Sequence, residues 1–214
     1  MNFDLTARYY WLIEKLVFGS ALERARSSLL PRLSESVSGR QARILVTGEG
    51  DGRLAEQIRR ALPEAQLLLT EASEKMRSQA QARLSASGRE MTHWVDSPAD
   101  AQPYEACVCC FYLDCYEGSE QKARLAEILD EESLNHLLLV DFVPPRGLQG
   151  GLMRAWARLL EFAMIRFFQL SCRTGARQIH NLDRLMDDTK WQLIETKTHY
   201  GAFVRAGLWR KIHH

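Results

Sequence analysis

Three glycines spaced two residues apart, Gly48, Gly50 and Gly52, are the residues whose type and spacing most clearly indicate chemistry. They follow an aliphatic run at residues 44–47 and precede a segment with apolar residues at helical spacing. Glycine adopts positive φ in a tight turn, and without a Cβ it lets a ligand approach the main chain closely. Free N–H groups at a strand-to-helix junction favour an electron-rich ligand. The pattern therefore predicts a loop that cradles a nucleotide.

Two acids end further strand-like runs. Glu71 lies about twenty residues beyond the loop, the interval that a βαβ unit requires. An ionised carboxylate can accept two hydroxyl donors at once, and such charge-assisted hydrogen bonds are stronger than neutral ones. Asp96 follows another strand-like run and precedes Ser97 and Pro98. A solvated strand end is the alternative for Glu71, and ordinary turn chemistry is the alternative for Asp96.

Alternating strand and helix patterns surround these residues. Strands are expected at 44–47, 65–72, 91–97, 105–111 and 136–143, and helices at 53–62, 73–84 and 121–129. Ser73 is expected to cap the second of these helices. Near-continuous apolar strands are typical of a parallel sheet covered on both faces, so the fold class is α/β. The segment 191–211 predicts an antiparallel hairpin that turns at Tyr200 and Gly201.

A single domain is expected over residues 1–214, with an N-terminal helical cap at 1–37 and an α/β core at 38–214. The helical pattern of the cap ends near Pro31, and the serine-rich segment 33–40 predicts a linker. Residues 152–170 predict a long helix that is rich in aromatic residues. That helix covers the sheet, or it forms an apolar substrate pocket or a lipid-facing surface.

Composition and charge bear on the kind of partner and on the cellular compartment that we expect. The 214 residues carry a net charge of +1, which gives no electrostatic reason to expect nucleic acid. No run of about 18 uncharged apolar residues predicts a transmembrane helix, and the N-terminus lacks the basic leader of a signal peptide. The five cysteines are an odd number, and four lie within 107–115. A reduced, cytoplasmic protein is the simpler interpretation.

The clustered cysteines also raise the question of metal binding. Zinc sites usually offer two CxxC-like pairs or added histidines. On one strand, Cys107 and Cys109 would point to one face and Cys110 to the other. Core packing and cavity lining are therefore expected, and no metal. Zinc or a thiol-bound metalloid is the alternative.

Residues 40–210 resemble the class I S-adenosylmethionine-dependent methyltransferases, of the type that acts on small molecules. The glycine loop matches the family's GxGxG motif, and Glu71 matches the acid that binds the ribose hydroxyls. The resemblance implies a Rossmann-like, seven-stranded, mostly parallel sheet with a C-terminal antiparallel hairpin. It also implies that the cofactor is bound by Gly48, Glu49, Gly50, Asp51, Gly52, Glu71, Ala72, Met76, Asp96, Ser97, Cys110, Phe111 and Tyr10.

Within that set, the resemblance implies that Met76 packs on adenine and that Asp96 and Ser97 lie near its amino group. Cys109, Cys110 and Phe111 would lie near the sulfonium, and Tyr10 or Tyr9 would reach the cofactor's carboxylate from an N-terminal helix. The implied reaction is in-line displacement, in which an O, N, S or C atom of a small acceptor takes the methyl group. S-adenosylhomocysteine is then the product. An apolar or aromatic acceptor is one alternative.

No general base is obligatory in such a reaction, because the sulfonium is already activated. If one is used, the candidates are Asp114, Asp141 and His199, at the carboxyl side of the sheet or in the hairpin. His136 begins a strand and is expected at the opposite end. The sequence leaves both the acceptor and the base open.

One departure from the family pattern keeps other functions open. The family commonly has an acid two residues before its first loop glycine, where this chain has Val46. The cofactor's ammonium would then be held by backbone carbonyls and Glu49. A non-catalytic module that binds S-adenosyl ligands or a partner is one alternative. An NAD(P)-dependent reductase is another, although its Tyr-x-x-x-Lys pair is missing and Leu54 replaces its next glycine.

Overall fold

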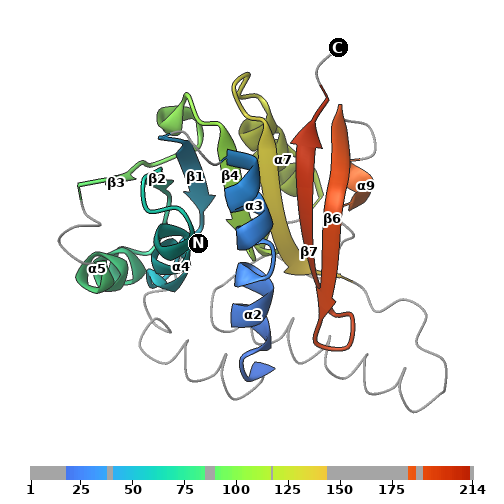
Figure 1. Ribbon diagram of the computed structural model, residues 1–214, viewed down its shortest axis with the longest axis horizontal. Coiled ribbons are helices and arrows are strands. Elements are labelled where there is room, and N and C mark those ends of the chain that lie inside the picture. Colours follow the sequence, from blue (N-terminus) through green and yellow to red (C-terminus); the bar gives the residue numbers. More distant parts are fainter. Residues whose placement is uncertain are drawn as a thin grey trace.

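The computed structural model describes residues 18–37, 41–84, 90–116, 118–143, 183–186 and 190–212. These residues form a seven-stranded sheet in the order β3-β2-β1-β4-β5-β7-β6 (Figure 1). The strands are β1 (Arg43–Thr47), β2 (Gln66–Leu69), β3 (Thr92–Trp94), β4 (Ala106–Cys110), β5 (His136–Phe142), β6 (Trp191–His199) and β7 (Val204–Lys211). The first five are parallel, and β7 is antiparallel to both β5 and β6. The expected Rossmann-like α/β sheet is confirmed.

Strand order brings the glycine loop to the middle of one sheet edge. β1 pairs with β2 on one side and with β4 on the other, so the carboxyl ends of the three strands are neighbours. All five residues of β4 are buried, as are the last four of β1, because helices cover both faces. The loops that follow these strands therefore meet at one place, which is where α/β sheets bind ligands.

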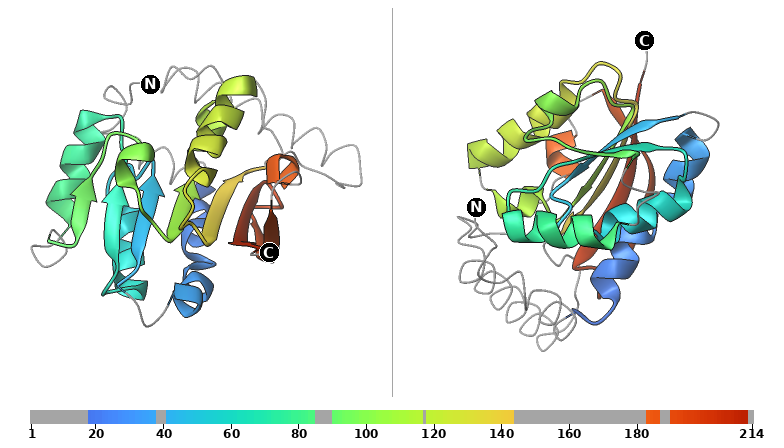
Figure 2. Two further views of the ribbon diagram at one scale, coloured as in Figure 1. Left: turned by 90° about the horizontal axis from the view of Figure 1, so that it is seen from above. Right: turned by 90° about the vertical axis from the view of Figure 1, so that its left-hand side faces the viewer.

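Helices cover both faces of the sheet (Figure 2). Each face has its own cluster of buried apolar side chains. One face carries α2 (Ala21–Ser27), α3 (Leu30–Val37) and α4 (Arg53–Ala61), with α5 (Glu74–Arg83) beside α4. The other face carries α7 (Gly118–Leu129) and α9 (Asp183–Met186). Two short 3-10 helices, η1 (Ala99–Ala101) and η2 (Leu113–Cys115), follow β3 and β4. Ser73 caps α5 as predicted, accepting a hydrogen bond from Met76 N at 3.3 Å.

The N-terminal segment departs from the prediction at Pro31. The helical pattern does not end there, because α3 starts at Leu30 and has Pro31 in its first turn. Proline is tolerated in that turn, where its missing N–H would have no helical partner. Residues 33–37, expected as a linker, continue α3 and bury Leu33 and Val37 against the sheet. The spacing of these apolar residues outweighs the serines between them.

Strand β4 distributes its cysteines as predicted. Cys107 and Cys109 pack in the core cluster under α7, and Cys110 packs in the cluster under α2, α3 and α4. The expectation that Cys109 lines the cofactor cavity is therefore wrong, because its side chain points to the other face of the sheet. Cys115 is buried as well. Burial raises the pKa of Cys110 to about 12 and also raises the pKa values of Cys107 and Cys109, so these thiols stay neutral.

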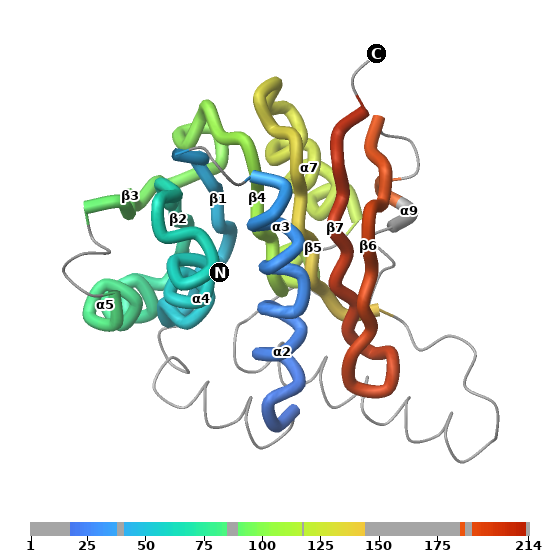
Figure 3. The backbone as a smooth tube through the Cα atoms, in the orientation of Figure 1, coloured from blue at the N-terminus to red at the C-terminus, as the bar shows by residue number. Residues whose placement is uncertain are grey.

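The C-terminal hairpin is also confirmed. β6 and β7 run side by side to a turn around Tyr200 and Gly201 (Figure 3). Along the part of the chain that is described, no helix is long and apolar enough to cross a membrane. Tyr9, Tyr10 and the predicted helix 152–170 lie outside the described residues.

Candidate functional site

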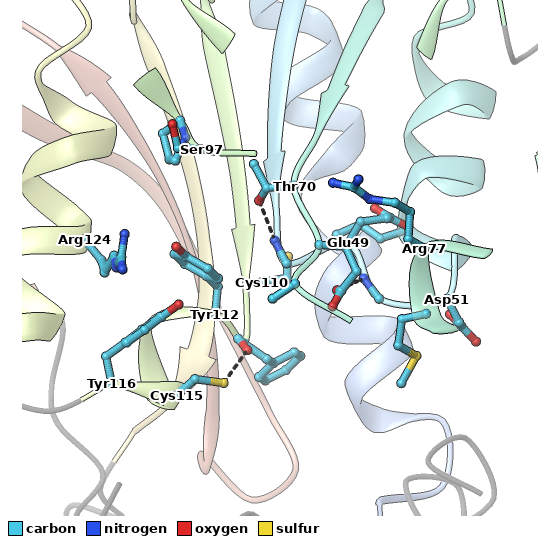
Figure 4. A pocket seen from close by; sticks show the side chains of 18 of the residues that line it. Glu49, Asp51, Thr70, Arg77, Ser97, Cys110, Tyr112, Cys115, Tyr116 and Arg124 are labelled. Carbon is cyan, nitrogen blue, oxygen red and sulfur yellow. Dashed lines mark hydrogen bonds between the residues drawn. The ribbon is translucent and has the colours of Figure 1, made fainter. Parts of the chain in front are cut away.

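A cavity of about 700 Å³ opens at the carboxyl edge of the sheet, beside the glycine loop (Figure 4). Its walls come from the ends of β1, β2, β3 and β4 and from α2, α5 and α7. Eleven of the predicted cofactor-binding residues line it: Gly48, Glu49, Gly50, Asp51, Glu71, Ala72, Met76, Asp96, Ser97, Cys110 and Phe111. Residues from separate strands therefore converge on one space, as the strand order requires.

The loop after β1 is bonded to the end of β2. Gly48 N donates to Thr70 Oγ1 at 3.2 Å, and Glu49 N donates to the Thr70 carbonyl oxygen at 3.0 Å. Gly50 N donates to Glu71 Oε2 at 2.8 Å. Three successive N–H groups that the sequence suggested for a ligand are thus used within the protein. They give the loop one conformation, and Thr70 is a supporting residue that the sequence analysis missed.

Gly52 has a packing role rather than a place in the cavity. It has a φ of 92°, and a Cβ built on it would lie 2.7 Å from Ala80 Cα of α5. A side chain there would collide with helix backbone, so the position requires glycine. Gly50 has a φ of 73°, but a Cβ on it would meet nothing within 4 Å. The open side of the loop is therefore at Gly50.

Glu71 is held by two backbone groups. Besides the bond from Gly50, its Oε1 accepts a hydrogen bond from Ser73 N at 2.7 Å. Burial raises the pKa of Glu71, and the backbone hydrogen bonds and the Arg77 charge oppose that rise. A carboxylate has about four lone-pair directions, so the bonds from Gly50 N and Ser73 N, together with the nearby Ala72 N–H, leave acceptor capacity. Because Glu71 lines the cavity, this capacity is available to a ligand.

Glu49 is the buried acid of the loop, with 5% of its surface exposed. Its Oε1 accepts a hydrogen bond from Ala55 N of α4 at 2.9 Å. Its Oε2 is also buried and has no hydrogen-bond partner among the described residues. Burial raises the pKa of Glu49 to about 8, with a smaller opposing effect from the positive charge of Arg26. A cationic group at Oε2 would stabilise the ionised form.

Asp51, the other loop acid, is occupied by arginines. Its Oδ1 lies 2.9 Å from Arg53 Nε, and its Oδ2 lies 3.5 Å from a terminal nitrogen of Arg83. Arg83 Nε also donates to the Asp51 carbonyl oxygen at 2.9 Å. Asp51 thus ties the loop to α4 and α5, which gives it a structural role in addition to its place on the cavity wall.

The end of β3 forms the outer rim. The Asp96 side chain is 93% exposed and lies 3.6 Å from Arg77, whose guanidinium also stacks on Trp94. Ser97 N and Oγ donate to Asp100 Oδ2 at 3.1 and 2.8 Å. The turn chemistry considered as an alternative is therefore present at Ser97, alongside its place in the cavity lining.

A wall of two tyrosines and an arginine was not predicted. Tyr112 and Tyr116 meet edge to face with centroids 5.3 Å apart, and Arg124 of α7 lies 5.4 Å above the Tyr116 ring. Figure 4 shows the three on the opposite side of the view from Glu49 and Asp51. The signal was available for Tyr112, which follows Phe111 directly. Tyr116 and Arg124 reach the cavity only through the path of η2 and α7.

Arg26 is a second unpredicted residue, supplied by α2. Its guanidinium lies 5.1 Å from the Phe111 ring centroid, and it lines the cavity near Glu49 and Cys110, on whose pKa values its charge acts. Phe111 has a φ of 52°, an uncommon conformation outside glycine. The chain turns sharply there, and the Phe111 ring packs against Phe142 with centroids 4.9 Å apart.

The candidate bases are not brought to the cavity. Asp114, Asp141 and His199 lie at the carboxyl side of the sheet, but none of them lines the cavity wall. Burial and the charges of Arg24 and Lys197 lower the pKa of His199. His136 pairs with Ala106 at the amino end of β4, at the opposite end from the glycine loop as expected.

Metal ligation finds no support in the described ranges. Within them, no group of three or more histidine, cysteine or acidic side chains is arranged to hold a metal ion. The fifth cysteine, Cys172, lies outside these ranges.

Methyltransferases are among the solved structures with the same fold. Mitomycin 7-O-methyltransferase MmcR matches 99% of this chain and 61% of its own, with a TM-score of 0.63 and 14% identity. The pyocyanin biosynthetic protein PhzM matches 99% of this chain and 62% of its own, with a TM-score of 0.65 and 14% identity. The CcbJ methyltransferase from Streptomyces caelestis matches 89% of this chain and 90% of its own, with a TM-score of 0.59 and 15% identity.

This chain thus spans about three fifths of the length of MmcR and PhzM. No protein-family model and no curated protein sequence matches it. The strand order, the antiparallel hairpin and these superpositions agree. The chain has the fold of the class I S-adenosylmethionine-dependent methyltransferases.

Proposed function

We propose that this chain is an S-adenosylmethionine-dependent methyltransferase that acts on a small-molecule acceptor. The observation that carries the proposal is the position of Glu71, bonded to Gly50 N at 2.8 Å and exposed to the cavity with acceptor capacity left. A carboxylate so held suits a pair of ribose hydroxyls. The fold, shared with proteins named as methyltransferases, supports the same conclusion.

The residues present fit this cofactor. A cavity of about 700 Å³ lies within the usual range for a ligand of this size. Glu49 Oε2 is a buried acceptor without a partner among the described residues, which suits an ammonium group. Gly50 leaves its side of the loop open to close approach. Glu49 thereby supplies the negative charge that Val46 lacks.

The side chains divide the cavity into three parts. Glu71 would accept hydrogen bonds from the ribose. Glu49, ionised by the ammonium that it binds, and the positively charged Arg26 would hold the ammonium and the carboxylate of the amino-acid end. Met76 and Asp96 would contact the adenine.

When bound, the cofactor supplies a methyl group activated by a positively charged sulfur. The contribution of the protein is then orientation and exclusion of water. Cys110 and Phe111 line the cavity at the end of β4, and the neutral thiol and the aromatic ring present no competing nucleophilic charge there. We assign no general base, since the three candidates lie outside the cavity lining.

A binding experiment tests the proposal. Calorimetric titration of the full chain with S-adenosylmethionine, S-adenosylhomocysteine and NADPH should give binding of the two S-adenosyl ligands and none of NADPH. Binding of NADPH alone would favour the reductase and reject the proposal. Incubation with methyl-labelled S-adenosylmethionine and a metabolite extract should then label a compound in the small-molecule fraction.

The labelling experiment also separates catalysis from binding alone. Label in a small molecule supports an enzyme, and its mass identifies the acceptor. Tight binding of both S-adenosyl ligands with no labelled product from any extract would instead favour the non-catalytic module.

A further inference from the structure

Two acids lie enclosed beneath the wall of the cavity. Asp141, near the end of β5, is 4% exposed, and its Oδ1 accepts a hydrogen bond from Phe142 N at 2.8 Å. Its Oδ2 is buried and has no hydrogen-bond partner among the described residues. Asp114, in the middle of η2, is partly exposed as a residue, but its Oδ1 is also buried and without such a partner. Neither acid has a role in the proposed reaction.

The two carboxyl groups affect each other. Burial raises the pKa of Asp114 to about 6 and the pKa of Asp141 well above its usual value, and the charge of Asp114 is the next largest cause for Asp141. Two ionised carboxylates repel strongly in an enclosed site, so such a pair retains one proton and titrates as a unit. The retained proton converts repulsion into attraction between η2 and β5.

The strands and helices around the pair contribute one charged side chain and several neutral ones. β7 places Arg205 opposite Asp141 in the β5–β7 register, and Arg205 Nε donates to Thr196 Oγ1 of β6 at 2.9 Å. β4 contributes the thiols Cys109 and Cys110, whose pKa values are raised, and η2 contributes Cys115. The neighbouring strand β1 ends at Thr47, whose buried Oγ1 also has no partner among the described residues. From α7, Gln121 Nε2 donates to the Leu113 carbonyl oxygen at 2.9 Å. This bond holds the start of η2.

η2 carries one wall of the cavity. Tyr112 precedes it, Cys115 belongs to it and Tyr116 follows it, and all three line the cavity. Tyr112 also packs over the glycine loop, since a Cβ on Gly48 would lie 3.1 Å from Tyr112 Cδ2. A shift of η2 would therefore move the wall and its contact with the loop together.

We propose that Asp141 and Asp114 are positioning residues, which hold η2 and its cavity wall in place while they share one proton and release them when that proton is lost. The pair acts through Tyr112, Cys115 and Tyr116, and it does not contact the reacting atoms. The affinity for the ligand should consequently fall at high pH, because the acid pair of the protein, and not the ligand, loses a proton. For its binding readout, the inference rests on the proposed function.

Hydrogen exchange as a function of pH tests the inference directly. Amide protection of residues 111–116, corrected for the intrinsic rate, should fall at least about fivefold as pH rises through the loss of the shared proton. Protection of β4 should stay constant. In Asp141→Asn, which keeps a neutral polar group at every pH, the fall should disappear. Asp130→Asn, a change of an exposed acid after α7, should behave as the unaltered chain does.

Two results would overturn the inference. One is protection of residues 111–116 that does not change with pH in the unaltered chain, and the other is an equal fall in Asp141→Asn. If Asp141→Asn does not fold, Asp114→Asn removes the same shared proton from the η2 side. The pH profile of the unaltered chain decides the question even if neither variant folds.

A parallel titration with S-adenosylhomocysteine separates this inference from the proposed function. Affinity should fall with the same midpoint as protection, and the fall should be absent in Asp141→Asn. If the chain binds no S-adenosylhomocysteine at any pH while the exchange transition is present, the proposed function fails and the acid pair stands. If the ligand binds and the protection of residues 111–116 does not change with pH, the inference about the acid pair is rejected and the proposed function stands.

Discussion

Glu71 Oε2 accepts a hydrogen bond from Gly50 N at 2.8 Å, which joins the acid after β2 to the central glycine of the loop after β1. The second oxygen of the same carboxylate binds Ser73 N, at the N-cap of α5. One side chain therefore connects the loop, the end of β2 and the start of a helix. The conformation of the loop and the position of the acid are set together.

Glu71→Gln should weaken the binding of S-adenosylhomocysteine by about ten- to a hundredfold, because a hydrogen bond to a charged acceptor contributes roughly 1.5–3 kcal/mol. The amide also presents N–H to Gly50 N or Ser73 N, where an acceptor is required. Isothermal titration calorimetry measures the change. Glu64→Gln, an exposed acid before β2, is the matched control. Unchanged affinity in Glu71→Gln would contradict the ribose assignment.

Arg26→Gln should weaken S-adenosylhomocysteine and leave adenosine unaffected. Adenosine lacks the amino-acid end, so it would not contact the cation that lies over Phe111. An expected loss of about tenfold corresponds to about 1.4 kcal/mol. Competition binding with both ligands measures the difference. Arg32→Gln, an exposed arginine of α3, is the control, and an equal loss for both ligands would place Arg26 elsewhere in the site.

The stability of the ligand-free chain should depend on pH through Glu49. Its pKa is raised from the ordinary 4.5 to about 8 in the folded state, so between these values the folded chain holds a proton that the unfolded chain lacks. The contribution is fully present below pH 4.5 and is lost as pH rises through about 8. In that window the group lowers the free energy of unfolding by about 1.4 kcal/mol per pH unit.

Glu49→Gln removes this dependence. Urea unfolding at several pH values should give a free-energy difference, variant minus unaltered chain, that grows more positive from pH 5 towards 8. Taking the difference cancels the contributions of Asp114 and Asp141, which both chains share. A difference that stays constant with pH would show that Glu49 is ionised in the free protein.

Gly52→Ala should destabilise the fold by about 2–4 kcal/mol, since it adds both backbone strain and a collision with Ala80. Gly50→Ala has a similar positive φ but open space around the new Cβ, so it should cost only about 1–2 kcal/mol. Chemical denaturation of the two variants isolates the effect of the collision. Equal losses would mean that α5 moves away from the loop at little cost.

Much of the fold follows from local patterns in the sequence. Continuous apolar runs predicted buried parallel strands such as β4, and the alternation along that strand separated Cys107 and Cys109 from Cys110. The pattern failed at Pro31, where a rule for helix ends was applied to a helix start. Both results depend on which neighbours a residue has within a few positions along the chain.

Spacing also predicted the residues that follow strands, such as Glu49, Glu71 and Asp96, because the carboxyl ends of parallel strands share one edge. Spacing could not predict which residues from different strands and helices contact one another at this edge. Only the packed structure decided that Arg26 and Arg124 reach the cavity, and that the Asp51 carboxylate forms ion pairs with arginine side chains. It also buried one carboxylate oxygen each of Asp141 and Asp114. Periodicity records the direction of a side chain from its own strand or helix, whereas burial, charge partners and cavity walls depend on residues far away in the sequence.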